Sequence, residues 1–90
     1  MKIYKYTLMP EDRQVVEMPK GATILSVGAD VFVPDNLCLW ALVDPGERPE
    51  MRVIHIHGTG HDVVTPERLT YIGTATMRSL SLVWHVFEEV

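Results

Sequence analysis

Short apolar stretches separated by turn-forming residues run along almost the whole chain. The β-branched and aromatic stretch Lys2–Leu8 predicts a first strand, and the short alternating stretch Arg13–Met18 predicts a second. The turn signals Pro10–Asp12 and Pro19–Gly21 end these two stretches. Neither stretch has the three-to-four-residue spacing of an amphipathic helix, so the pattern indicates β structure.

The middle of the chain continues this pattern and contains its most apolar segment. Ala22–Val27 is predicted to be a strand, Gly28–Asp30 a bulge or turn, and Val31–Val33 a further short β segment. After the turn residues 34–36, Leu37–Val43 is a continuous apolar run. A run of this length between turn signals predicts a strand that is buried on both faces.

The second half of the chain predicts three more strands and one helical turn. Arg52–His57 predicts a strand, and Thr65–Arg68 predicts a helix cap followed by proline and one turn of helix. Tyr71–Thr76 and Leu80–Glu89 predict the last two strands. One parity of the final strand holds Leu80, Leu82, Trp84, Val86 and Glu88. Because its other parity also carries large apolar groups, this strand is expected to be central in a sheet or in a subunit interface.

Six to eight short strands with regularly spaced turns predict an all-β fold. We expect a compact sandwich or barrel with at most one short helical turn, formed by a single domain over residues 1–90. A chain of this size buries roughly 60–65% of its unfolded surface, which leaves little stability in reserve. Strands that are apolar on both faces therefore predict that the protein completes its core as a homo-oligomer.

Composition and charge exclude several classes of partner. The net charge of −4 gives the chain no global attraction to duplex nucleic acid or to an anionic membrane. No stretch approaches the ~20 apolar residues of a membrane span. Cys38 is the single cysteine of the chain, and its apolar surroundings predict that it packs as a small hydrophobe. The absence of a disulfide framework favours the cytoplasm.

Three of the four histidines fall within Arg52–Asp62. His55 and His57 are two positions apart on a predicted strand, so they point to the same face and could converge on one metal ion. His61 could supply a third ligand if the glycine turn folds back, with Asp62 orienting one of the rings. The alternative is a polar sheet face followed by a structural turn, and the residues leave both interpretations open.

The turn at Gly58–Gly60 carries a second candidate chemistry. Successive backbone N–H groups around glycines can form a nest for phosphate, to which Thr59 could add its hydroxyl. The ligand-binding residues expected on this basis are Gly58, Thr59, Gly60, His61, Arg52 for charge pairing and Trp40 for stacking. The alternatives are a glycine turn with positive φ and a tryptophan that packs in the core or in a subunit interface. The chain contains no Walker or Rossmann motif.

Six motifs occur together in the chain. In order they are IYKY, DRQVVEMPKGATILSV, LCLWALVDP, GTGH, YIGT and LVWHVFE. As a set that covers most of the chain, they resemble a family of small uncharacterised proteins of phages, prophages and bacterial genomes. The resemblance implies a phage or mobile-element context, and it supplies no catalytic residues because the family has no established activity. The chain departs from the family around Gly28–Asn36 and in the IHIH before GTGH, which weakens the metal interpretation.

Three functional hypotheses follow. The first is a non-enzymatic binding module without a cofactor, which in a phage setting would inhibit host defence in the host cytoplasm. It would bind a defence protein or sequester a nucleotide signal at Gly58–His61. The second is a metal-dependent enzyme of cupin type with His55, His57 and His61 as ligands. The third is a virion accessory protein.

Overall fold

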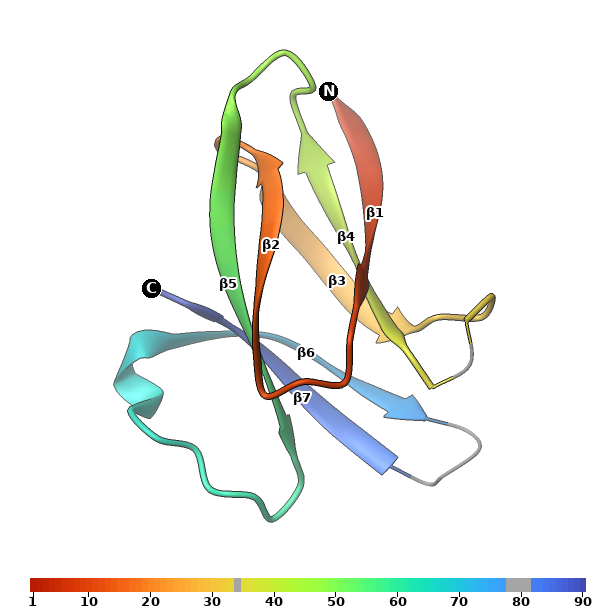
Figure 1. The fold of residues 1–90 in the computed structure, drawn as a ribbon, viewed down its shortest axis with the longest axis vertical. Coiled ribbons are helices and arrows are strands. Elements are labelled where there is room, and N and C mark those ends of the chain that lie inside the picture. Colours follow the sequence, from red (N-terminus) through yellow and green to blue (C-terminus); the bar gives the residue numbers. More distant parts are fainter. Residues whose placement is uncertain (34, 78–81) are drawn as a thin grey trace.

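The computed structural model describes residues 1–33, 35–77 and 82–90. This part of the chain forms seven strands and one short 3₁₀ turn (Figure 1). The elements are β1 (Lys2–Leu8), β2 (Arg13–Pro19), β3 (Thr23–Ala29), β4 (Leu37–Val43), β5 (Pro49–Gly58), η1 (Pro66–Arg68), β6 (Leu69–Met77) and β7 (Leu82–Glu89). The all-β prediction is therefore confirmed. Leu80 and Ser81, which the sequence assigns to the last strand, lie outside the described residues.

The strands form two antiparallel sheets that pack as a sandwich. One sheet has the order β1-β4-β3, and the other has the order β2-β5-β7-β6. The two most apolar strands, β4 and β7, are thus central strands. The central position of β7 is one of the two alternatives predicted from its two-sided apolar character. In β4 the consecutive residues Leu37, Cys38 and Leu39 are all buried, so this strand is buried on both faces there, as predicted.

The core lies between the two sheets and takes alternate residues from each strand. Leu39 and Ala41 of β4 face Ile54 and Ile56 of β5 and Val86 of β7 across the interior, and all five are almost completely buried. The other buried residues of this cluster are Leu8, Met18, Ala22, Leu37, Val43, Ala75 and Met77.

Cys38 lies on the opposite face of β4 from this core and is also buried. Burial raises the pKa of its thiol, as expected for a cysteine that packs as a small hydrophobe.

Strand β5 changes partner along its length. Its first part, Pro49–His55, pairs with β2, while its last part, Ile54–Gly58, pairs with β7. Only Ile54 and His55 have a neighbour in both registers. The final residues of β5 therefore extend beyond the beginning of β2, and this leaves space beside His57 that the adjoining loops border.

The two sheets approach closely where the edge strands β3 and β6 meet. A Cβ atom at Gly73 would lie only 2.9 Å from Cγ1 of Val27, so this corner accepts only glycine without rearrangement. The register of β6 against β7 shifts between Tyr71 and Gly73, which marks a bulge at the same place. The bulge and the missing side chain together let the sheets converge on this side of the sandwich.

Three local predictions differ from the structure. Val31–Val33 forms a bend rather than a β segment, because the buried carboxylate of Asp30 accepts hydrogen bonds from the backbone N–H groups of Phe32 (2.9 Å) and Val33 (3.3 Å). The bulge of β3 lies between Ile24 and Ser26, and the strand continues through the expected turn to Ala29.

The expected cap at Thr65 is also absent. Thr65 precedes the helical turn with a positive φ of 53°, and its hydroxyl donates to the carbonyl oxygen of Val64. The proline at the start of the turn and the single turn that follows are as predicted. None of the helices in the described part of the chain has the length and apolar character needed to cross a membrane.

Candidate binding face on the four-stranded sheet

Ring side chains gather on the outer face of the β2-β5-β7-β6 sheet. His55 and His57 of β5 alternate with the buried Ile54 and Ile56, so their side chains point away from the core. Residues directly opposite each other in an antiparallel pair share a face, which adds three further rings to this surface. The ring face is defined here as His55, His57, Tyr71, His85 and Phe87.

The rings of this face touch one another across three strands. His55 and His57 are stacked with centroids 5.8 Å apart, and the edge of His57 meets Phe87 at the same centroid distance. Phe87 in turn packs edge-on against Tyr71 of β6 at 5.6 Å. Such contacts restrict the rotamers of the rings, so the face presents a fixed aromatic surface.

His85 is held by hydroxyl groups on both sides of its ring. Its Nε2 lies 2.7 Å from the hydroxyl of Thr59, and its Nδ1 lies 3.1 Å from the hydroxyl of Thr74. The hydroxyl of Tyr71 also bonds to Thr74. Both ring nitrogens of His85 are therefore engaged inside the protein, which fixes the orientation of the ring.

A charged group closes the opposite end of the ring face. Glu89 Oε1 lies 3.3 Å from Nε2 of His55, and Glu89 Oε2 accepts a long hydrogen bond of 3.5 Å from Arg13. Partial burial acts to raise the pKa of Glu89, but the hydrogen bond with His55 and the charge of Arg13 outweigh it. The pKa of Glu89 therefore lies below its ordinary value.

A depression of about 530 Å³ lies at the edge of this face, beside the end of β5. Its floor comes from the strand and its walls come from the two loops that border it. The lining residues are Asp12, His55, His57, His61, Asp62, Val64 and Thr65. The backbone N–H of Ile56 donates to the carbonyl oxygen of Asp12 at 3.0 Å, which fixes one wall against the strand.

Three polar groups around the depression have no partner within the described part of the chain. Nε2 of His57 is shielded from solvent and makes no hydrogen bond there. The carboxylates of Asp12 and Asp62 likewise have neither a hydrogen bond nor an ion pair with any described residue. A shielded polar atom without a partner costs roughly 1–3 kcal/mol, and among these three groups this applies only to Nε2 of His57, because Asp12 and Asp62 are exposed to solvent.

The glycine turn beside the depression is closed by its own backbone hydrogen bond, which uses one N–H group of the candidate anion nest. The backbone N–H of His61 donates to the carbonyl oxygen of Gly58 at 3.1 Å, and the positive φ of 88° at Gly60 makes this tight reversal possible. The ring of His61 folds over Gly58, where an added Cβ atom would lie 2.8 Å from it. One N–H needed for a phosphate nest is thus used within the turn, and the hydroxyl of Thr59 is used by His85.

The three histidines proposed as metal ligands are not assembled for coordination. In residues 1–33, 35–77 and 82–90, no group of three or more His, Cys, Asp or Glu side chains could hold a metal ion. The rings of His55 and His57 are stacked within 28° of parallel, so their in-plane lone pairs do not meet at one point, and Nε2 of His55 faces Glu89. His61 contributes to the depression instead.

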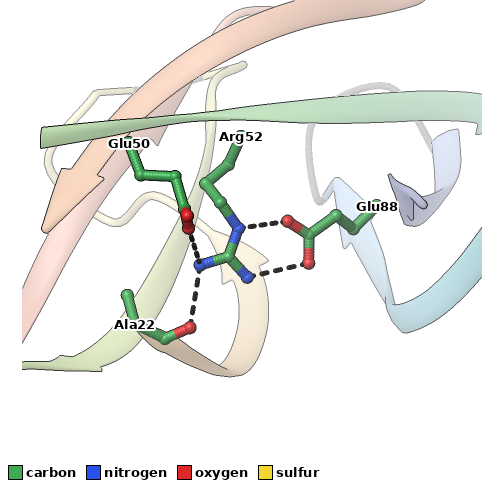
Figure 2. Close-up of polar contacts among 4 residues, drawn as sticks. All are labelled: Ala22, Glu50, Arg52 and Glu88. Carbon is green, nitrogen blue, oxygen red and sulfur yellow. Dashed lines mark hydrogen bonds and ion pairs between the residues drawn. The ribbon is translucent and has the colours of Figure 1, made fainter. Parts of the chain in front are cut away.

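Arg52, which the sequence suggested for ligand binding, is satisfied inside the sandwich (Figure 2). Its Nε and Nη2 donate to the two carboxylate oxygens of Glu88, the second at 2.9 Å, and its Nη1 donates to the carbonyl oxygen of Ala22 at 2.8 Å. Glu50 lies 3.8 Å from the same nitrogen. The hydrogen bond to Glu88 is the main cause that raises the pKa of Arg52, against the opposing effect of burial. Arg52 ties the two sheets together.

Trp40 lies away from the glycine turn. It belongs to β4 in the three-stranded sheet, opposite Ser26 and Lys5 in the strand registers, and its ring covers Gly28. It alternates with the core residues Leu39 and Ala41, so it faces outward from that sheet. The structure therefore keeps Gly58, Thr59, Gly60 and His61 together and separates Trp40 and Arg52 from them.

Sequence reasoning missed Asp12, Tyr71 and Phe87 as members of the site. A signal was present for the last two, because Phe87 shares the parity of His85 on its strand and Tyr71 begins the preceding predicted strand. Finding Asp12 requires the register of β2 against β5, which a single sequence does not give.

The fold and the site define a small two-sheet β-sandwich with a ring-lined outer face. The chain belongs to the family described as domain of unknown function DUF7352, which matches residues 1–90. Comparison with curated proteins and with solved structures finds no significant match.

Proposed function

We propose that this protein is a non-catalytic module that binds another protein through the outer face of its four-stranded sheet. The observation that carries the proposal is the ring face, in which five ring side chains from three strands form one surface. Exposed apolar side chains continue this surface, since Val15 and Met51 lie on the same side of the sheet and are more than half exposed. Aromatic residues, Met and Arg are the residue types enriched at protein interfaces.

The charges on this face favour a protein over a nucleotide. Phosphate recognition needs cations that are free to pair, but Arg13 on this face pairs with Glu89, and Arg52 points into the sandwich, where Glu88 holds it. The depression beside the rings carries the carboxylates of Asp12 and Asp62, which repel phosphate. The net charge of −4 adds attraction for a partner with a basic surface. In the phage setting implied by the sequence resemblance, that partner would be a host defence protein.

Site-specific photo-crosslinking tests this proposal. Benzoylphenylalanine is placed at Met51 or Tyr71 on the proposed face, and at Ile3 on the outer face of the other sheet, in bacterial cells that produce the protein. Ile3 is a matched control because its exposed fraction of 62% is close to the 64% of Met51. We expect adducts from Met51 and Tyr71 to the same segment of one partner protein, and none from Ile3.

Other outcomes overturn the proposal. Equal adducts from all three positions, or none from any, would show that this face has no preferred partner. An adduct between two copies of this chain would make the face a homo-oligomer interface instead. Heat from a calorimetric titration with cyclic or linear nucleotides would restore the nucleotide hypothesis and replace the protein partner.

A further inference from the structure

We infer that the ring face is an acid-sensitive surface, which binds the partner while His57 is neutral and releases it when His57 is protonated. This inference rests on the proposed protein-binding function. All four histidines of the chain lie on the ring face or at the depression beside it. Histidine is the side chain that ordinarily changes its charge between pH 5 and 8, so mild acid changes the charge on this side of the molecule.

The present position of His57 has no room for a proton on both ring nitrogens. Its Nε2 is shielded from solvent and has no hydrogen-bond partner within the described part of the chain. A neutral imidazole carries one proton, so a shielded nitrogen can remain a lone pair with nothing to donate. The protonated ring is a donor at both nitrogens, and its Nε2–H would carry charge where no acceptor is present. Protonation of His57 therefore requires the ring to move.

The stack with His55 adds a second reason for movement. Nε2 of His55 faces Glu89 at 3.3 Å, so the charge of a protonated His55 has a carboxylate beside it. His57 has no carboxylate in contact with its ring, and its centroid is 5.8 Å from that of His55. When both rings are protonated, the stack becomes a contact between like charges, which favours separation of the rings.

The surroundings of His57 offer its ring a second position. The titratable groups that face it are His55 on its own strand, His85 opposite on β7, and Asp12, His61 and Asp62 around the depression. Arg13 and Glu89 lie on the far side of His55. The depression has a volume of about 530 Å³, and the carboxylates of Asp12 and Asp62 are exposed there. A protonated ring that leaves the stack can therefore turn into the depression, where water and two negative charges are available.

This movement removes the contacts that make the ring face a fixed surface. The ring of His57 connects His55 to Phe87, so its departure leaves Phe87 in contact with Tyr71 alone among the rings of this face. A partner would then have to order the rings again on binding, which lowers its affinity. The net charge of −4 counts the histidines as neutral, and four protonated histidines would cancel it. Attraction to a basic partner therefore falls at the same time.

Nuclear magnetic resonance tests the movement without any partner. Between pH 8 and pH 5, we follow the ring shifts of His57 and the nuclear Overhauser contact between the rings of His57 and Phe87. We expect this contact at pH 8 and its loss in acid, with a midpoint that coincides with the titration of His57 itself. The contact between Phe87 and Tyr71 is the internal control and should persist, because neither ring titrates in this range.

Photo-crosslinking from Met51 and Tyr71 in permeabilised cells, buffered at pH 7.5 or pH 5.5, tests the effect on the partner. We expect the yield for the parent protein to fall several-fold in acid. His57→Phe keeps a ring in the stack but takes up no proton, so its yield should change little between the two pH values. His61→Phe is the matched control, since it removes an exposed histidine outside the ring face and should leave the acid response of the parent protein.

A His57–Phe87 contact that persists once His57 is protonated would overturn the inference. So would a His57 ring that takes up no proton down to pH 5, or an equal fall in crosslinks for the parent protein and His57→Phe. If crosslinks converge on one partner with the same yield at both pH values, the protein-binding function stands and the acid-sensitive surface fails. If no crosslinks form at either pH, the protein-binding function fails and the release of a partner fails with it, whereas the resonance data still decide whether the ring turns.

Discussion

Replacing Arg52 by methionine removes the guanidinium that joins β5, β7 and the turn before β3. The exposed fractions of the Arg52 and Glu88 side chains are 16% and 22%, so the variant leaves a carboxylate that is mostly hidden from water without its partner. Breaking a fully buried pair costs about 3–5 kcal/mol. Because both groups keep some contact with solvent, we expect about 2–3 kcal/mol here, which includes the unpaired carbonyl of Ala22.

The double variant Arg52→Met/Glu88→Leu separates the pair from the packing around it. Replacing both charges by apolar side chains of similar length removes the desolvation cost together with the attraction. We therefore expect its stability to lie within about 1 kcal/mol of the parent protein, with the remaining loss arising from the carbonyl of Ala22. The double variant should therefore be roughly 2 kcal/mol more stable than Arg52→Met.

Urea unfolding at pH 7, followed by tryptophan fluorescence, measures these differences. With a slope of about 1 kcal/mol/M for a domain of this size, Arg52→Met should lower the midpoint by roughly 2 M. Arg13→Met is the matched control. It breaks the ion pair between Arg13 and Glu89, and the Arg13 side chain is more than half exposed. It should cost less than about 0.5 kcal/mol. Equal losses in Arg52→Met and Arg13→Met, or a double variant no more stable than Arg52→Met, would refute this reasoning.

Three further predictions concern other parts of the molecule. Gly73→Ala should lower the free energy of unfolding by about 1–3 kcal/mol, because the methyl group meets the partly buried side chain of Val27 at the sheet corner. An unchanged midpoint of urea unfolding would contradict the close approach there. Gly60→Ala should lower the free energy of unfolding by about 1 kcal/mol because of the positive φ of 88° at this position. Gly60→Asn should lower it by less, because asparagine adopts a positive φ more readily than alanine. The hydrogen bond from Phe32 and the pairing with Lys5 hold the pKa of Asp30 below its ordinary value against the effect of burial. Its stabilisation is therefore complete above its unfolded pKa of about 3.9 and is lost as the pH falls through the folded value. Between pH 7 and pH 2.5 the melting temperature of Asp30→Asn should therefore fall less steeply than that of the parent protein. Parallel curves for the two proteins would show that Asp30 does not contribute to this pH dependence.

The fold was predictable because its signals are local. Turn residues fix where most strands end, and the continuous apolar run Leu37–Val43 predicts a strand buried on both faces without knowledge of its partners. The segment Val31–Val33 misled the prediction, since its apolar β-branched residues suit a strand. The side chain of Asp30 satisfies the backbone N–H groups that a neighbouring strand would otherwise bond, and tertiary context overrides propensity there.

The candidate site was predictable only where it follows one strand. The shared face of His55 and His57 follows from their spacing, and the ring contact confirms it. The role of Arg52 depends on Glu88, which is 36 positions away, and thus on register. A sign of it is visible in the sequence, because Arg52 has the parity of the core residues Ile54 and Ile56. A charge on a core-facing parity needs an internal partner, and Glu88 has the same property on the last strand.

The change of partner along β5 explains where the depression beside His57 forms. Where β2 and β7 both flank the strand, at Ile54 and His55, the sheet is continuous. Beyond that point β2 is absent, so the outward side of His57 is bordered by loops that carry Asp12 and Asp62. Loops that border a rigid sheet can change their side chains without disturbing the core. The register therefore places the carboxylates of two loops beside a fixed aromatic surface, and a lengthened β2 that paired with His57 should remove the depression while preserving the ring face.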